Sequence, residues 1–249
     1  MATLRCESLS KSFDGVQALA DFHFVFPSAG ITAIIGPNGA GKTTLINLMS
    51  GFLRPDSGRV FFGEREITLF VPHKIARLGI ARTFQDLRLI LQMPALDNVL
   101  LARPGQRGER LFYALFPFGL KEEEVRNRAD AIRLLRYVGL EEKAGALAGE
   151  LSYGEQKLLT LACCLATEAK VLLLDEPVAG VHPAMALRIL DLLRELRDDG
   201  KLVVFIEHDI SAVRRIAEQV ILLDHGKIIA QGVPNEVLEQ AEIMEAYLE

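Results

Sequence analysis

Short, almost wholly apolar runs alternate along the chain with segments in which apolar residues recur every three or four positions. The runs are rich in Ile, Val and Leu, which is typical of strands buried on both faces. They occupy residues 31–35, 171–174, 202–206 and 220–223. After the first run, a helical pattern places these residues on one predicted face: Leu45, Leu48, Met49 and Phe52. Strands that alternate with helices predict an α/β fold.

Two further regions predict antiparallel pairing. Residues 3–26 carry short alternating apolar patterns that are broken at Asp14-Gly15, as in paired antiparallel strands. Near the C-terminus, Asp224-His225-Gly226 separates two apolar stretches in the manner of a hairpin connection. Residues 59–63 and 79–84 are typical of additional strands. The expected architecture is therefore an α/β core accompanied by an antiparallel β subdomain.

Between residues 86 and 165, strand signals are weak and helical stretches predominate. One stretch carries an apolar stripe formed by Val125, Ala129, Ile132 and Leu135. This change of pattern predicts one domain over residues 1–249, in which a helical subdomain at 86–165 is inserted between core segments 1–85 and 166–249.

The first part of the helical subdomain has two interpretations. Residues 86–118 combine apolar side chains with several aromatic ones. They form either a docking surface for a partner or the subdomain's own core, and the pattern leaves both open.

Composition narrows the class of protein. Half of the residues are apolar, 24% are charged and the formal net charge is −5, so nothing favours nucleic acid as a partner. No apolar run approaches the roughly 18 residues of a membrane span, and the N-terminus lacks the layout of a signal peptide. Three cysteines, with Cys163 and Cys164 adjacent in an apolar helical run, agree with a reducing compartment. We therefore expect a soluble, cytoplasmic protein.

The pattern G-x-x-x-x-G-K-T runs from Gly36 to Thr43, directly after a predicted strand and before a predicted helix. A phosphate-binding loop requires that context, because its backbone N–H groups and the helix N-terminus point at phosphate oxygens. Lys42 is expected to reach the β- and γ-phosphates of a nucleoside triphosphate, and the Thr43 hydroxyl to bind Mg²⁺. The predicted phosphate-binding residues are Gly36, Pro37, Asn38, Gly39, Ala40, Gly41, Lys42, Thr43 and Thr44.

Polar residues at other predicted strand ends supply the chemistry of hydrolysis. Asp175 is placed to hold Mg²⁺, and Glu176 is the natural general base for the attacking water. Gln85 contacts either Mg²⁺ or that water, and His208 can hydrogen-bond the γ-phosphate. Together with Lys42, these residues form the predicted catalytic and metal-binding set.

The segment Leu151-Ser152-Tyr153-Gly154-Glu155-Gln156 opens a predicted helix. Ser152 is a good N-cap, so a plain helix start is one interpretation. The other is a second anion site, where the Ser152 hydroxyl and the Gly154 N–H point at a phosphate of another subunit's nucleotide. Two interpretations also exist for Phe13. Its ring either packs as a strand aromatic or stacks on a nucleotide base.

These motifs, in this order, resemble the ATP-binding cassette of ABC transporters over essentially the whole chain. The resemblance implies a RecA-like P-loop NTPase core, adenine stacking by Phe13, a Q-loop at Gln85 and a switch histidine at His208. It also implies a head-to-tail dimer that sandwiches two ATP molecules. Each phosphate loop would then face the partner subunit's signature segment, formed by Ser152, Tyr153, Gly154 and Glu155.

Finer features resemble the ATPases of branched-chain amino acid importers, with urea and short-amide importers as close relatives. The features are Gly79 to Gln85, Leu151 to Gly154, Asp175-Glu176-Pro177, Ala179-Gly180 and Tyr247-Leu248. Two departures from the family pattern concern the site: Glu155 stands where many cassettes have Gln, and His182 where most have Asp.

The expected function is ATP hydrolysis that powers an importer of branched-chain or related amino acids. The expected partners are two transmembrane permease subunits, a second ABC ATPase subunit that is identical or related, and, indirectly, an extracytoplasmic substrate-binding protein. No nucleic-acid partner is expected. The chain is expected to lie peripherally on the inner face of the cell membrane. The alternatives are an importer ATPase for urea or short amides and a soluble ABC ATPase without a transport role.

Overall fold

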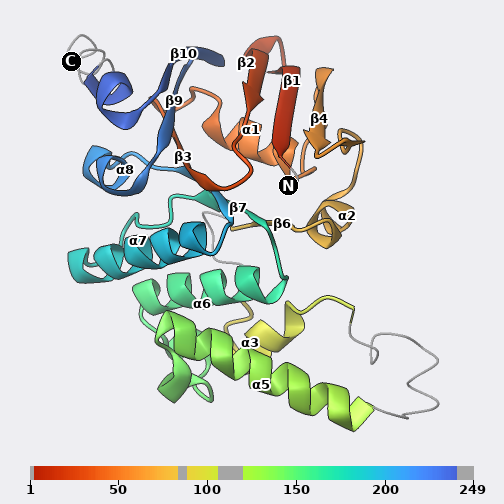
Figure 1. The fold of residues 1–249 in the computed structure, drawn as a ribbon, viewed down its shortest axis with the longest axis vertical. Helices are drawn as coiled ribbons and strands as arrows, with labels where there is room; N and C mark the ends of the chain where they lie inside the picture. Colours follow the sequence, from red (N-terminus) through yellow and green to blue (C-terminus); the bar gives the residue numbers. More distant parts are fainter. Residues whose placement is uncertain (1–2, 84–88, 106–119, 240–249) are drawn as a thin grey trace. The chain divides into compact units, whose positions relative to one another are not determined.

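A computed structural model describes residues 3–83, 89–105 and 120–239 (Figure 1). The chain divides into two compact units. Unit 1 draws on Met1–Arg82, Lys170–Ala179 and Pro183–Glu249, and unit 2 on Thr83–Ala169 and Gly180–His182. The predicted subdomain boundaries, after residues 85 and 165, lie close to these junctions, but the short return of the chain to unit 2 at 180–182 was not expected.

Unit 1 is built on a six-stranded sheet with the strand order β10-β9-β3-β8-β7-β6. Every neighbouring pair is parallel except β9 and β10, which form the predicted antiparallel hairpin. The strands are β3 (Gly30–Ile35), β6 (Ile80–Arg82), β7 (Val171–Asp175), β8 (Leu202–Ile206), β9 (Gln219–Asp224) and β10 (Lys227–Gly232). The accompanying helices are α1 (Lys42–Met49), α2 (Pro72–Arg77), α7 (Pro183–Asp198) and α8 (Ile210–Ile216).

The three central strands explain the position of the site. All residues of β3, β7 and β8 are buried, as their unbroken apolar runs predict. The register places Ile206 beside both Ile34 and Asp175. Because the strands are parallel, the polar residues that follow them meet at one edge of the sheet, where ligands bind in open α/β folds.

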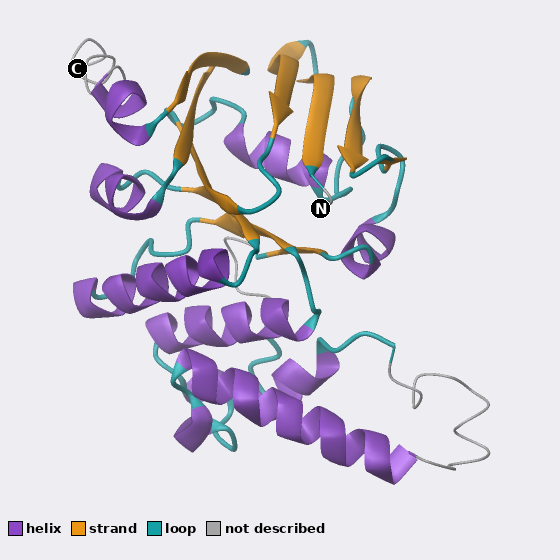
Figure 2. Ribbon diagram, viewed as in Figure 1, coloured by secondary structure: helices purple, strands orange, loops and turns teal. Residues whose placement is uncertain are grey.

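A four-stranded antiparallel sheet, with the order β2-β1-β4-β5, completes unit 1 (Figure 2). Its strands are β1 (Leu4–Phe13), β2 (Val16–Val25), β4 (Ser57–Phe62) and β5 (Arg65–Glu66). The predicted break at Asp14-Gly15 is the β1–β2 turn, and the core unites both sheets with α1, since Phe22 and Leu45 belong to one buried cluster. Phe52 was wrongly placed on the α1 face: the helix ends at Met49, and Phe52 is 41% exposed.

Unit 2 is helical in its described part. Its helices are α3 (Ala95–Leu101), α5 (Leu120–Val138), η2 (Glu141–Lys143), η3 (Ala148–Glu150) and α6 (Tyr153–Ala166), and α3, α5 and α6 pack on one another. The stripe predicted for α5 is only partly correct. Val125 and Ala129 are exposed, whereas Ala131, Leu135 and Val138 are buried. Packing against neighbouring helices, rather than helical periodicity alone, determines which part of the stripe is covered.

No helix within the described ranges is long and apolar enough to cross a membrane. The cysteines are free thiols, with Cys164 buried and Cys163 partly buried. Burial raises the pKa of both adjacent thiols to about 12, so they stay protonated and unreactive at neutral pH. The pair therefore acts as small packing residues of α6.

Candidate functional site

The predicted phosphate loop connects the end of β3 to the start of α1. Gly36 and Gly41 have φ values of 143° and 102°, which side chains other than glycine's avoid. Their surroundings are equally restrictive. A Cβ at Gly36 would lie 2.0 Å from the carbonyl oxygen of Leu223, and one at Gly41 would lie 2.3 Å from that of Ala18. Only glycine therefore permits this loop to pack against β9 and β2.

Lys42 is buried at the first position of α1, with 6% of the residue exposed. Its Nζ atom donates to the carbonyl oxygens of Gly36 and Pro37 at 2.7 and 2.9 Å. Burial lowers the pKa of the Lys42 ammonium, and the nearby carboxylates of Glu176 and Asp175 oppose that shift. The ammonium thus lies folded over the loop, close to both predicted acids.

The residues around the loop suit the phosphates of a nucleotide. No side chain caps the N-terminus of α1, and the first turn holds no acidic residue, so its N–H groups and positive dipole end remain suited to an anion. Thr43 is exposed and Thr44 is half-buried. For Mg²⁺, no group of three or more His, Cys, Asp or Glu side chains within residues 3–83, 89–105 and 120–239 forms a ready-made cage. The predicted metal set of Thr43, Asp175 and Gln85 relies on other ligands, and Gln85 lies outside the described residues.

A hairpin distant in sequence supports the loop. Gly226, in the β9–β10 turn, donates its N–H to the carbonyl oxygen of Ala40 at 3.0 Å. The carbonyl oxygen of Gly226 accepts from the N–H of Ala20 on β2 at 2.8 Å. The sequence indicates a hairpin at this place, but nothing in it signals that the turn contacts the phosphate loop.

Asp175 ends β7 and is 5% exposed. Nη2 of Arg82, on the neighbouring strand β6, lies 3.7 Å from Oδ2 of Asp175. Nη1 of Arg82 also donates to Oδ1 of Asn47 on α1 and to Oγ of Ser50, the C-cap of that helix, at 2.5 and 3.2 Å. Arg82 therefore links the predicted metal ligand to the helix of the phosphate loop. The sequence alone assigned Arg82 no role, although an arginine within a predicted strand is the signal that could have drawn attention to it.

Glu176 and His208 meet beyond the ends of β7 and β8. Oε1 of Glu176 lies 3.3 Å from Nε2 of His208, and both side chains are partly exposed. Glu176 has a φ of 49°, an unfavourable conformation for a residue with a side chain and one that occurs at functional sites. Its N–H donates to the carbonyl oxygen of Ile206 at 3.0 Å. The structure thus brings together the predicted general base and the predicted switch histidine.

Phe13 ends β1, and 43% of the residue is exposed. The ring does not belong to the buried core; Lys11 Nζ lies 5.5 Å from its centroid. Of the two interpretations from local sequence, a packed strand aromatic is the less compatible with this exposure, and base stacking stays a prediction.

In unit 2, the signature segment begins helix α6. Ser152 is its N-cap, and Ser152 and Glu155 form a capping box. Oε2 of Glu155 accepts from the N–H and the Oγ of Ser152, both at 2.9 Å, and Oε1 lies 2.5 Å from Nζ of Lys143. Tyr153 is 45% exposed, and Gly154 is partly buried. The interpretation of Ser152 as a helix cap is confirmed, and the role of the segment as an anion site stays a prediction.

The Lys143–Glu155 pair gives a pH-dependent prediction for stability. The hydrogen bond from Lys143, helped by those from Ser152, holds the pKa of the Glu155 carboxyl below its usual range. The carboxylate therefore contributes stability above its unfolded-state pKa, and this contribution is lost as the pH falls through the lower folded-state pKa. Glu155→Gln keeps a capping side chain but loses the ion pair. At pH 7 it is expected to lower the free energy of unfolding by about 0.5 kcal/mol.

Urea denaturation followed by circular dichroism measures this difference. The gap between wild type and Glu155→Gln should shrink as the pH falls below 4.5, the usual pKa of a glutamate. Glu64→Gln, at an exposed position between β4 and β5, is the matched control. A gap that stays constant between pH 7 and strongly acidic pH would contradict the ion-pair origin.

Strand β3 leads into a glycine-rich loop and an uncapped helix. Asp175 and Glu176 stand at the end of β7, which is separated from β3 only by β8, at the same edge of the sheet. This arrangement defines a P-loop nucleoside triphosphatase. Comparison with known proteins then gives the family: a family model described as ABC transporter matches residues 19–179. The chain belongs to this family, and it is an ATP-binding cassette with ATPase activity.

Individual relatives agree with this assignment. The chain is 39% identical to a probable branched-chain amino acid transport ATP-binding protein, LivG, of Archaeoglobus fulgidus, over 100% of this chain and 96% of the relative. It is similar to the ADP conformation of an ATP-binding cassette of an ABC transporter, with a TM-score of 0.85 and 35% identity over 100% and 99% of the two chains. A dimeric bacterial ABC transporter cassette matches with a TM-score of 0.78 and 25% identity, over 93% and 98%. The predicted P-loop NTPase fold is confirmed.

Proposed function

We propose that this ATPase powers an ABC importer for branched-chain or related amino acids. The observation that carries the proposal is the full-length similarity to a relative named as a branched-chain amino acid transport ATP-binding protein. The ATPase subunit does not itself contact the transported substrate, so the proposal for the substrate rests on that similarity alone.

The site residues have complementary roles in hydrolysis. Lys42 and the N–H groups of the loop and α1 hold the β- and γ-phosphates. Thr43 and Asp175, with Gln85, would hold Mg²⁺, which neutralises phosphate charge when bound. Glu176 Oε1 accepts the proton of the attacking water, and His208, 3.3 Å away, orients that carboxylate and the γ-phosphate. Phe13, with an exposed ring, stacks on adenine.

The signature segment serves the second half of the site. We place Ser152, Tyr153, Gly154 and Glu155 against the ATP held by a partner ATPase subunit, in a dimer of identical or related chains. The exposure of Ser152 and Tyr153 supports this role. The similar bacterial cassette, which is described as a dimer, supports it too.

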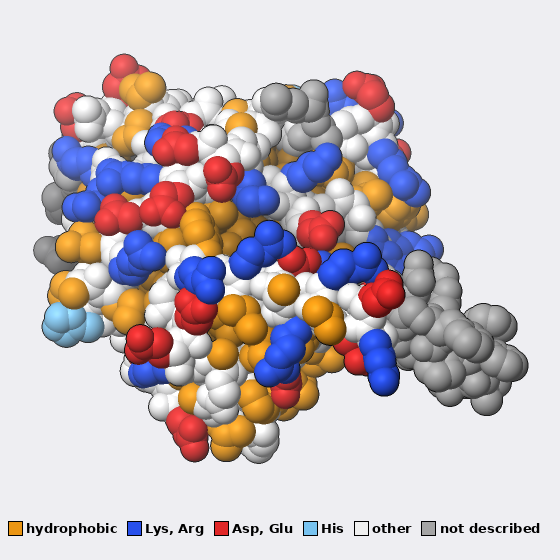
Figure 3. Space-filling view, turned by 60° about the horizontal axis from the view of Figure 1, so that its bottom comes forward, with side chains coloured by type: hydrophobic (Ala, Val, Ile, Leu, Met, Phe, Trp, Pro, Cys, Tyr) orange, Lys and Arg blue, Asp and Glu red, His pale blue; other side chains and the backbone are white. Residues whose placement is uncertain are grey.

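The helical unit offers apolar surface for the permease subunits. Within residues 89–105, Ile90, Leu91 and Leu101 are 42%, 44% and 58% exposed, whereas Leu96 and Val99 are buried. The core interpretation therefore applies to Leu96 and Val99, and we propose the exposed residues of this segment as a docking surface. Leu89 and Met93 of the same predicted set are half-buried. Residues 86–88 and 106–118 of the predicted docking segment lie outside the described residues. In Figure 3, apolar side chains lie among charged ones of both signs.

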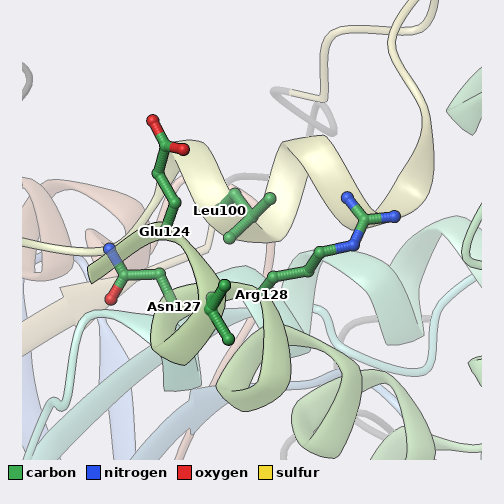
Figure 4. Close-up of a pocket in the computed structure, with 5 residues that line it drawn as sticks. Leu100, Glu124, Asn127 and Arg128 are labelled. Atoms are coloured by element: carbon green, nitrogen blue, oxygen red, sulfur yellow. The ribbon is translucent and has the colours of Figure 1, made fainter. Parts of the chain in front are cut away.

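A cavity of about 380 Å³ lies between α3 and α5 (Figure 4). Among the described residues, Leu100 from α3 and Val125 from α5 give it an apolar part, and Glu124, Asn127 and Arg128 of α5 also line it. None of these residues belongs to the predicted ATP site. We assign this cavity, with the exposed apolar residues, to the surface that a permease subunit contacts. Through that permease the ATPase would act indirectly on an extracytoplasmic substrate-binding protein.

Co-purification tests this proposal. A tagged chain is expected to recover two multi-span proteins from a detergent extract, which would place the ATPase peripherally on the inner face of the membrane. Leu91→Lys should weaken this recovery because a charge would enter the apolar docking surface, while ATP binding stays unchanged. Val25→Lys, on exposed residue 25 of β2, is the matched control. Recovery of no membrane protein would favour a soluble ABC ATPase without a transport role.

The substrate needs a separate measurement. In the reconstituted complex, ATP hydrolysis should rise when the binding protein carries leucine, isoleucine or valine. Stimulation by urea or short amides, and not by these amino acids, would contradict the assigned substrate class and favour the related importers instead.

A further inference from the structure

Glu207 is a buried acid that the mechanism above does not use. It lies one residue beyond β8 and is 2% exposed. Its Oε1 accepts from the N–H of Val178 at 2.9 Å, and its Oε2 accepts from the N–H of His208 at 3.3 Å. Each carboxylate oxygen is thus engaged by a backbone amide.

The two amide donors belong to the segments that carry the catalytic pair. Val178 lies two residues after Glu176, and His208 directly follows Glu207. The same segments are joined by a backbone hydrogen bond from the Glu176 N–H to the Ile206 carbonyl oxygen at 3.0 Å. The carboxylate therefore ties the Glu176 loop to the His208 loop at a second point, next to the contact between their side chains.

Burying a carboxylate is unfavourable unless hydrogen bonds compensate for the lost water. Hydrogen bonds that an ionised acceptor receives are about twice as strong as neutral ones. Such a group is suited to hold two loops in a fixed arrangement. Glu207 is 2% exposed, so its carboxylate is less accessible to an attacking water than the partly exposed side chain of Glu176.

We propose that Glu207 is a positioning residue for ATP hydrolysis, which maintains the contact between Glu176 and His208 through its bonds to the two loops. The inference rests on the proposed roles of Glu176 and His208. It predicts a defect in turnover and not in nucleotide binding, because the Glu207 carboxylate bonds to the amides of Val178 and His208, whereas Lys42 Nζ donates to Gly36 and Pro37 of the phosphate loop.

Glu207→Gln tests the proposal in the full-length chain, or in the reconstituted complex if hydrolysis requires it. Glutamine keeps one acceptor but turns an NH₂ group toward the other amide. We expect kcat to fall about tenfold, while the Kd for ATP stays within about twofold. Glu207→Met removes both acceptors and should lower kcat further. Equal losses of kcat and ATP affinity, or wild-type kcat in Glu207→Gln, would overturn the proposal.

Glu218→Gln is the matched control. The Glu218 carboxylate also accepts a backbone N–H, that of Ile31 at 3.2 Å, but Ile31 lies near the start of β3, at the opposite end of the strand from the phosphate loop. The same chemical change there should leave kcat and ATP affinity unchanged. A kcat loss in this control as large as that in Glu207→Gln would show a general effect of stability and overturn the positioning role.

A double-mutant cycle separates positioning from general damage. In a His208→Ala background the Glu176–His208 contact no longer exists, so adding Glu207→Gln should lower kcat by less than about twofold. Fully additive losses would overturn the proposal. If His208→Ala alone leaves kcat unchanged, the proposed role of His208 fails as well; if only Glu207→Gln is silent, the role of Glu207 alone is wrong.

Amide hydrogen exchange keeps the proposal testable if the Glu207 variants do not fold. In the wild-type chain the Val178 N–H lies in a loop and donates to the Glu207 side chain, so it should exchange slowly. Exchange of Val178 at the rate of an unstructured peptide would overturn the proposed bond, whereas strong protection supports it.

Discussion

Replacement of Lys42 by alanine is expected to abolish useful ATP binding. Lys42 is 6% exposed, and its ammonium donates to two carbonyl oxygens of the phosphate loop, a position from which it can reach an anion held by the same loop. Loss of this charge removes a charge-assisted bond to the β- and γ-phosphates and takes away a cation that interacts with Asp175 and Glu176. We expect the Kd for ATP to rise at least about hundredfold.

Titration with a fluorescent ATP analogue measures this loss, and circular dichroism verifies that the variant is folded. Lys74→Ala, on the exposed side of α2, removes the same charge far from the loop in sequence and should bind ATP normally. Retention of wild-type affinity by a folded Lys42→Ala variant would refute the assignment of the phosphate loop.

Glu176→Gln is expected to uncouple binding from hydrolysis. Glutamine keeps the size of the side chain at this strained position, where φ is 49°, but it cannot accept the proton of the attacking water. The phosphate loop is unchanged, so ATP should bind with near wild-type affinity while kcat falls about 10² to 10⁴-fold. Since ATP would persist between the two subunits of the proposed dimer, the variant should also accumulate as an ATP-bound dimer.

Phosphate release and size-exclusion chromatography with ATP measure the two effects. Glu168→Gln is a closely matched control, because Glu168 also has a positive φ, of 60°, and lies three residues before the start of β7. It should hydrolyse ATP at the wild-type rate. Unchanged hydrolysis in Glu176→Gln would show that Glu176 is not the general base. Slow hydrolysis without accumulation of a dimer would contradict only the proposal that two subunits share the ATP site.

The sequence was sufficient for the buried strands and for the position of the phosphate loop between a strand and a helix. An unbroken apolar run such as Ile31 to Ile35 predicts a strand that is buried on both faces. The structure confirms this, because every residue of β3 is buried. The phosphate loop can also be predicted from local sequence, since its glycines, Lys42 and the following helix are consecutive in the chain. Ser152 as the N-cap of α6 was predictable for the same reason. Local pattern was less reliable for α5, where Val125 is exposed although it shares a stripe with buried Leu135.

The tertiary structure alone decided how distant segments support the site. Gly226 bonds to Ala40, Arg82 approaches Asp175, and Glu207 joins Val178 to His208. In each case the chemistry depends on a distance between strands or loops that lie far apart in the chain. A residue type can show that an arginine or a glutamate requires a partner when buried, but only the packing of the sheet determines which partner it meets.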